Sequence, residues 1–170
     1  MSQSLSQLRK FVSPEIIFGA GCRHNVGNYA KTFGARKVLV VSDPGVIAAG
    51  WVADVEASLQ ALGIEYCLYS GVSPNPRVEE VMLGAELYRE NHCDVIVAVG
   101  GGSPMDCGKG IGIVVAHGRS ILEFEGVDTI RVPSPPLILI PTTAGTSADV
   151  SQFVIISNQQ ERMKFSIVSK

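Results

Sequence analysis

A continuous apolar run that ends in three glycines is the feature of this sequence that most restricts its fold. The run covers residues 95–99, and Gly100, Gly101 and Gly102 separate it from a helical pattern over residues 103–117. A buried strand that turns directly into a helix leaves bare N–H groups at the helix start, and these attract phosphate. The turn therefore predicts binding of a nucleotide pyrophosphate. A second interpretation stays open, in which the glycines only allow a tight strand-to-helix turn.

Apolar runs alternate with helical patterns along the whole chain, which favours right-handed crossovers and a mostly parallel α/β sheet with flanking helices. We expect strands at residues 16–18, 37–43, 64–69, 94–99, 137–140, 153–156 and 165–168, and helices at 22–33, 46–62, 77–92 and 103–117. Residues 158–162 are typical of a hairpin connection between the last two strands.

Four residues follow strands or the turns after them: Asp43, Asn75, Gly101 and Thr142. Parallel sheets bind ligands beyond the carboxyl ends of their strands. We therefore expect these four residues, which span about 100 positions of sequence, to converge on one edge of the sheet.

The carboxylate of Asp43 could accept hydrogen bonds from both hydroxyls of an adenosine ribose and repel a 2′-phosphate, which favours NAD over NADP. Asp43 also suits the N-cap of a helix, because proline and glycine follow it. Asn75 lies between two prolines that restrict its backbone, so it suits either a fixed amide contact or an ordinary turn.

Asp106 and Lys109 are three residues apart at the start of the helical pattern, so they share a face. Lys109 could neutralise a phosphate, and Asp106 could hold a hydroxyl, a metal-bound water or Lys109 itself. The alternative is an ion pair on the helix surface, worth less than ~1 kcal/mol.

Residues 141–151 form a second segment with the character of a binding site, because several hydroxyl residues and a glycine follow a buried strand. Hydroxyls and N–H groups there can bind adenine, ribose or phosphate. Alternatively, they cap a loop through bonds to local backbone. Together with the glycine turn, the segment becomes a specific signal.

The bulk composition excludes several classes of protein. The net charge is −2 with no basic run, so we expect no nucleic-acid partner, and no apolar run reaches the ~18 residues of a membrane span. Residues 1–7 lack the pattern of a signal peptide, which predicts a cytoplasmic protein. The four cysteines fit no common zinc spacing and are expected to be reduced packing residues, and the three histidines are scattered, so no metal site is expected.

The chain resembles the iron-containing (group III) alcohol dehydrogenases. The resemblance rests on residues 100–109 and 141–151, supported by Asp43, residues 74–76 and residues 163–165. It implies a Rossmann-like dinucleotide-binding domain over residues 1–170. It also implies a metal-dependent enzyme that transfers hydride between an alcohol or aldehyde and NAD.

The resemblance further implies a cofactor cleft in this chain, with no catalytic residue and no metal ligand. Asp43 would face the adenosine ribose, while Thr142, Thr143, Thr146 and Ser151 would line the cofactor. The other implied contacts are Asn75, Gly100, Gly101, Gly102, Ser103, Asp106, Lys109 and Lys164. At Gly101, a methyl group would fill the space for pyrophosphate and strain a backbone expected to have positive φ.

The chain departs from the family pattern in two ways. First, Asp149 stands where the family usually has Glu. Second, the sequence ends at Lys170, before the family's all-helical domain. That domain holds the divalent metal (Fe or Zn) and its ligands, one aspartate and three histidines. We therefore expect an inactive cofactor half whose uncovered apolar surface favours a homo-oligomer, such as a dimer. Two other functions stay open: a related dehydrogenase or synthase for a polyol or phosphorylated substrate, and a non-catalytic nucleotide-binding module.

Overall fold

A four-stranded parallel sheet forms the centre of the computed structural model, which describes residues 14–168. Its strands lie in the order β2 (Glu65–Tyr69), β1 (Lys37–Val41), β3 (Val95–Gly100) and β5 (Leu137–Pro141). All three pairings are parallel, and β3 is buried along its whole length. The two central strands, β1 and β3, are almost continuously apolar and buried because helices cover both faces of the sheet.

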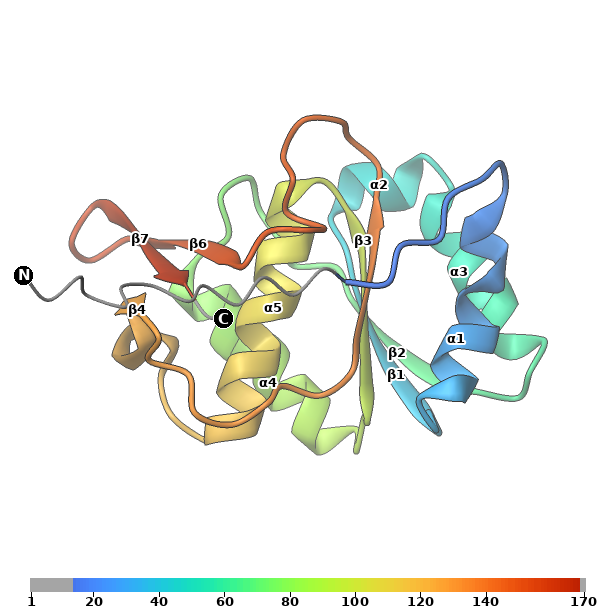
Figure 1. The fold of residues 1–170 in the computed structure, drawn as a ribbon, viewed down its shortest axis with the longest axis horizontal. Coiled ribbons are helices and arrows are strands. Elements are labelled where there is room, and N and C mark those ends of the chain that lie inside the picture. Colours follow the sequence, from blue (N-terminus) through green and yellow to red (C-terminus); the bar gives the residue numbers. More distant parts are fainter. Residues whose placement is uncertain (1–13, 169–170) are drawn as a thin grey trace, which may run out of the picture.

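Two helical layers enclose the sheet (Figure 1). On one face lie α1 (Val26–Thr32), preceded by the short helix η1 (Cys22–Asn25), and α3 (Trp51–Gln60). On the other face lie α4 (Val78–Glu90) and α5 (Gly102–His117). Strand β1 contributes to both cores, because Val38 and Val40 pack with the first layer while Leu39 and Val41 pack with the second.

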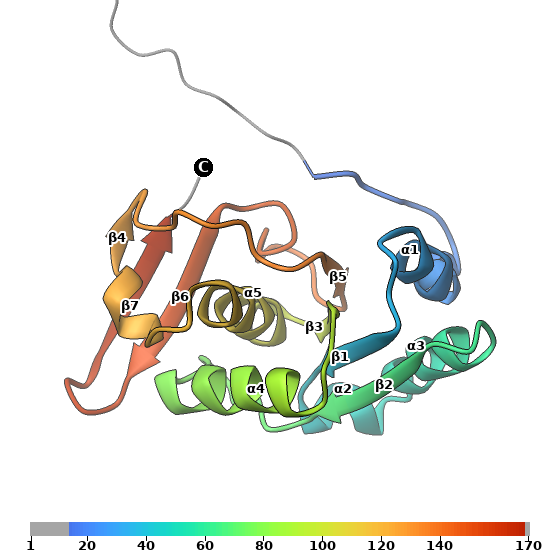
Figure 2. The ribbon, with the colours of Figure 1, turned by 90° about the horizontal axis from the view of Figure 1, so that it is seen from below.

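A second, smaller sheet lies on the far side of α5 from the main sheet (Figure 2). It contains β4 (Gly126–Val127), which follows the short helix η2 (Ile121–Phe124), together with β7 (Met163–Val168) and β6 (Phe153–Asn158). Strands β6 and β7 pair antiparallel, which confirms the predicted hairpin. Alternate residues of β6, Val154 and Ile156, are buried in the same core as α5.

The predicted fold class is confirmed, whereas two predicted elements are wrong. Residues 16–18 form no strand and pair with no other strand within the described chain, and Phe18 is 98% exposed. The single helix expected over residues 46–62 is interrupted at Gly50, whose φ is +83°, and becomes α2 (Pro44–Ala48) and α3. The expectation about residues 1–7 falls outside the described residues. None of the helices within residues 14–168 is both long and apolar enough to cross a membrane.

Candidate functional site

The glycine turn between β3 and α5 is shaped by a different glycine from the one expected. Gly100 has a φ of +150°, and a Cβ there would lie 2.5 Å from Cγ of Pro104, so only glycine fits. Gly101 has a φ of −81°, so the expectation of positive φ at this position is wrong. A Cβ added at Gly101 would lie 3.1 Å from Oγ1 of Thr143. The constraint at Gly101 therefore comes from a neighbouring side chain and not from the backbone.

The first turn of α5 has N–H groups available for a ligand. Gly101 is the N-cap and supplies no side-chain acceptor, and Pro104 has no N–H. The N–H groups of Gly102 and Ser103 are therefore the leading donors of a 16-residue helix, at the positive end of its dipole.

Residues 142–146, called the threonine segment below, fold back over this turn. The N–H of Thr142 donates to the carbonyl of Gly100 across 2.8 Å, which continues the pairing of β3 with β5. Thr143 and Thr146 follow, and a Cβ at Gly102 would lie 3.5 Å from Cβ of Thr146. All three threonines are exposed. Threonine side chains that are about 40 residues away from the glycine turn in the sequence thus lie beside the start of α5.

Asn75 connects the glycine turn to β7. Its N–H donates to Oγ of Ser103 across 3.1 Å, and its Oδ1 accepts a 2.6 Å hydrogen bond from Nζ of Lys164. The backbone of Asn75 is left-handed, with a φ of +59°. Asn75 is therefore a turn residue, as one of its two interpretations predicted, and its contact with a cofactor stays a prediction. Lys164 is exposed, so its ammonium group reaches solvent beside the turn.

Asp43 caps α2, as one of its two interpretations predicted. Its Oδ1 accepts from the N–H of Gly45 at 2.9 Å and of Val46 at 3.0 Å, which leaves Oδ2 able to accept further hydrogen bonds. The sequence reasoning missed the preceding Ser42, whose buried hydroxyl donates to the carbonyl of Val99 across 2.8 Å. This bond holds the end of β1 against the end of β3. A lone hydroxyl at the end of an apolar run was the available signal.

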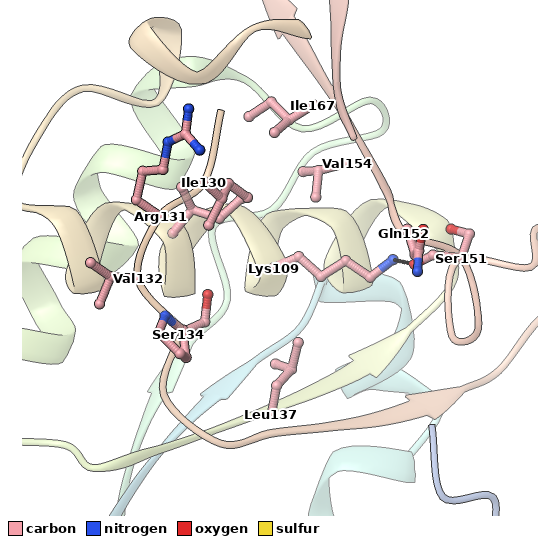
Figure 3. A pocket seen from close by; sticks show the side chains of 12 residues that line it. Lys109, Ile130, Arg131, Val132, Ser134, Leu137, Ser151, Gln152, Val154 and Ile167 are labelled. Carbon is pink, nitrogen blue, oxygen red and sulfur yellow. Dashed lines mark hydrogen bonds between the residues drawn. The ribbon is translucent and has the colours of Figure 1, made fainter. Parts of the chain in front are cut away.

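Lys109 and Asp106 form a largely buried pair and not the surface ion pair considered as an alternative, because their side chains are only 11% and 13% exposed. Nζ of Lys109 lies 3.8 Å from Oδ1 of Asp106 and donates to the carbonyls of Ser151 at 3.0 Å and Phe153 at 3.1 Å. Figure 3 shows the ammonium group turned toward Ser151. Lys109 thus ties α5 to the chain entering β6, and its expected contact with phosphate stays a prediction.

Burial dominates the electrostatics of this pair. It lowers the pKa of Lys109, and the neighbouring carboxylates of Asp106 and Asp149 oppose that shift. Burial likewise raises the pKa of Asp106. The positive charge of Lys109 opposes this shift, as does the N–H of Ile155, which donates a hydrogen bond to Oδ2 of Asp106. Oδ1 of Asp106 has no hydrogen-bond partner among the described residues. Both charges are therefore costly to bury and depend on each other.

A groove of about 430 Å³ lies elsewhere, between α5, residues 130–137 and β6 (Figure 3). Of the thirteen predicted cofactor residues, only Lys109 and Ser151 line it. The groove is thus distinct from the glycine turn and from Thr142, Thr143 and Thr146.

The described residues hold no gathering of three or more His, Cys, Asp or Glu side chains that could bind a metal ion. His117 has a structural role near the end of α5, where its Nε2 faces the N–H groups of Arg131 and Val132 at 3.1 and 3.2 Å.

Residues 13–170 match the family model described as iron-containing alcohol dehydrogenase. The chain is 41% identical over 154 residues to the 1,3-propanediol dehydrogenase of Citrobacter freundii, covering 89% of this chain and 40% of that protein. It is 40% identical over 154 residues to alcohol dehydrogenase 4 of Schizosaccharomyces pombe, covering 91% of this chain and 36% of that protein. The chain thus spans well under half the length of these relatives.

Solved structures show the same fold. A crystal structure of a 1,3-propanediol oxidoreductase superposes with a TM-score of 0.92 at 37% identity, over 96% of this chain and 43% of that one. The sulfoacetaldehyde reductase of Bifidobacterium kashiwanohense, in complex with NAD⁺, gives a TM-score of 0.85 at 30% identity, over 96% of this chain and 44% of that one.

Proposed function

This chain belongs to the iron-containing alcohol dehydrogenase family, and from that membership we propose that it is the NAD-binding part of an enzyme interconverting alcohols and aldehydes. The observation that carries the proposal is the uncapped start of α5, around which Asn75, Lys164 and the threonine segment gather. The NAD⁺ complex of the structural relative supports the choice of cofactor.

The chain's own groups have distinct tasks in this proposal. The N–H groups of Gly102 and Ser103 bind the pyrophosphate at the positive end of α5. Lys164, held by Asn75, adds a positive charge beside them. Oδ2 of Asp43 accepts a hydrogen bond from the adenosine ribose, and its negative charge repels a 2′-phosphate. When bound, NAD would supply the acceptor for the hydride that leaves the alcohol carbon.

The family's metal does not fit the described residues, which bring no three ligands together. We therefore propose that this chain by itself binds NAD without oxidising alcohols. A stoichiometric bound ion together with NADH formation by this chain would contradict that part of the proposal.

We also propose that the chain self-associates. Ile16 and Phe18 are 62% and 98% exposed, and Phe153 and Ile155 form an exposed apolar face on β6 at 51% and 46%. Exposed apolar patches of this kind mark association surfaces. Sedimentation of the chain at several concentrations tests this, and a monomer at every concentration would contradict it.

Titration calorimetry with NAD and NADP tests the cofactor assignment. The unmodified chain should bind NAD at least tenfold more tightly, a difference of about 1.4 kcal/mol. The variant Asp43→Ser keeps a good N-cap for α2 but removes the charge, so it should lose this preference without losing stability. Equal affinities of the unmodified chain for the two cofactors would overturn the role of Asp43.

A further inference from the structure

Two cysteines that are distant in sequence meet beside the sheet. Cys67 lies on the edge strand β2, and Cys93 lies between α4 and β3. Their Sγ atoms are 3.4 Å apart, although 26 residues separate them in the chain. A disulfide bond is about 2.05 Å long, so a small movement of the two sulfurs would suffice to form one.

Regular structure positions both thiols. Cys67 pairs in register with Leu39 of β1, and both pack in the core that contains α4. The N–H of Cys93 donates to the carbonyl of Tyr88 across 2.9 Å, and the N–H of Asp94 donates to the carbonyl of Lys37 across 2.9 Å. The backbone around each cysteine is therefore fixed, and the approach of the sulfurs follows from the fold.

The two thiols differ in access and in acidity. Cys67 is partly exposed, whereas Cys93 is 7% exposed. The hydrogen bond with Cys93 lowers the pKa of Cys67, burial opposes this shift, and the nearby ammonium of Lys37 adds to the lowering. That hydrogen bond and burial both raise the pKa of Cys93. Because the thiolate is the nucleophile, Cys67 is suited to attack an oxidant and Cys93 to resolve the product.

We propose that Cys67 and Cys93 form a reversible redox site that takes small-molecule disulfides, such as oxidised glutathione. The Cys67 thiol loses its proton to solvent, and its sulfur attacks one sulfur of the oxidant, whose S–S bond breaks and releases one thiol. Cys93 then loses its proton and attacks Cys67, forming the protein disulfide and releasing the second thiol. One small disulfide is thereby reduced to two thiols while two protein thiols are oxidised to one disulfide.

The test treats the folded chain with oxidised glutathione and maps the products by mass spectrometry. We expect a Cys67–Cys93 bond that a small thiol reverses. Cys22, which is also partly exposed, should carry at most a mixed disulfide with glutathione. Cys107 is fully buried, so its survival as a free thiol reports that the chain stayed folded.

Two variants separate the roles of the thiols. Cys93→Ser removes the resolving thiol, so a glutathione adduct should accumulate on Cys67. Cys67→Ser should leave Cys93 unmodified, because Cys93 is buried. The proposal is overturned if the unmodified chain accumulates the adduct on Cys67 without closing the bond. It is equally overturned if Cys67 stays a free thiol under conditions that modify Cys22.

Discussion

Replacing Gly101 by alanine should weaken NAD binding while leaving the chain folded. The new Cβ would lie 3.1 Å from Oγ1 of Thr143, so the threonine must move by a few tenths of an ångström away from the start of α5. Gly101 has ordinary negative φ, so the backbone accepts alanine and the free energy of unfolding should change by less than about 1 kcal/mol. The displaced threonine disturbs the proposed pyrophosphate site at the start of α5. Weakening one charge-assisted hydrogen bond in that site costs about 1.4 kcal/mol, which is about tenfold in NAD affinity.

Two other glycine-to-alanine substitutions serve as controls in the same assays, calorimetry for NAD and urea unfolding for stability. In Gly112→Ala the new Cβ meets Cβ of Ser134 at the same 3.1 Å, but far along α5, so NAD affinity should not change. Gly100→Ala combines a φ of +150° with a Cβ 2.5 Å from the rigid Pro104 ring. It should lose about 2–6 kcal/mol of stability. Unchanged affinity in Gly101→Ala, or an equal loss in Gly112→Ala, would refute the reasoning.

Substitutions at three further positions, Lys109, Lys164 and Asp43, test other parts of the structure, and two of them have a control variant. Lys109→Met should lower the free energy of unfolding in urea by about 3 kcal/mol, because it leaves the largely buried Asp106 without its counter-charge. The control Lys31→Met, at an exposed position, should change that free energy by no more than about 0.5 kcal/mol. Lys164→Met should weaken NAD binding by about threefold to tenfold with little change in stability, since Lys164 is exposed; an unchanged calorimetric titration would remove it from the site. Asp43→Ala should lose about 1 kcal/mol of stability through the lost cap of α2, and a loss as large in Asp43→Ser would argue against capping.

Local patterns predicted the central sheet well. The run that became β3 is continuous, apolar and followed by glycines, so its strand-to-helix turn could be read from adjacent residues. The failures came from information that apolar spacing does not carry. Gly50 interrupts a helical pattern through its left-handed backbone, and residues 16–18 have strand-like composition without a partner strand in the described chain. The two-residue β4 exists only through its pairing with β7.

The candidate site was predictable in its parts and not in its connections. The convergence of the glycine turn with the threonine segment follows from parallel strands ending at one edge. The hydrogen bond from Lys164 to Asn75 spans 89 residues and depends on how the small sheet packs over α5. The same packing brings the carbonyl of Phe153 to Lys109, whose ammonium donates a hydrogen bond to it. Side-chain partners set by tertiary packing could not be read from spacing alone.

The most direct test of the proposed site is an NMR titration of the isotope-labelled chain with NAD. The account predicts that the largest amide shifts fall on Gly101, Gly102, Ser103 and Thr143, around the start of α5. Residues that line the groove, such as Ile130, should shift little, because the groove is distinct from the glycine turn. Shifts concentrated in the groove, with the start of α5 unaffected at saturating NAD, would contradict the account.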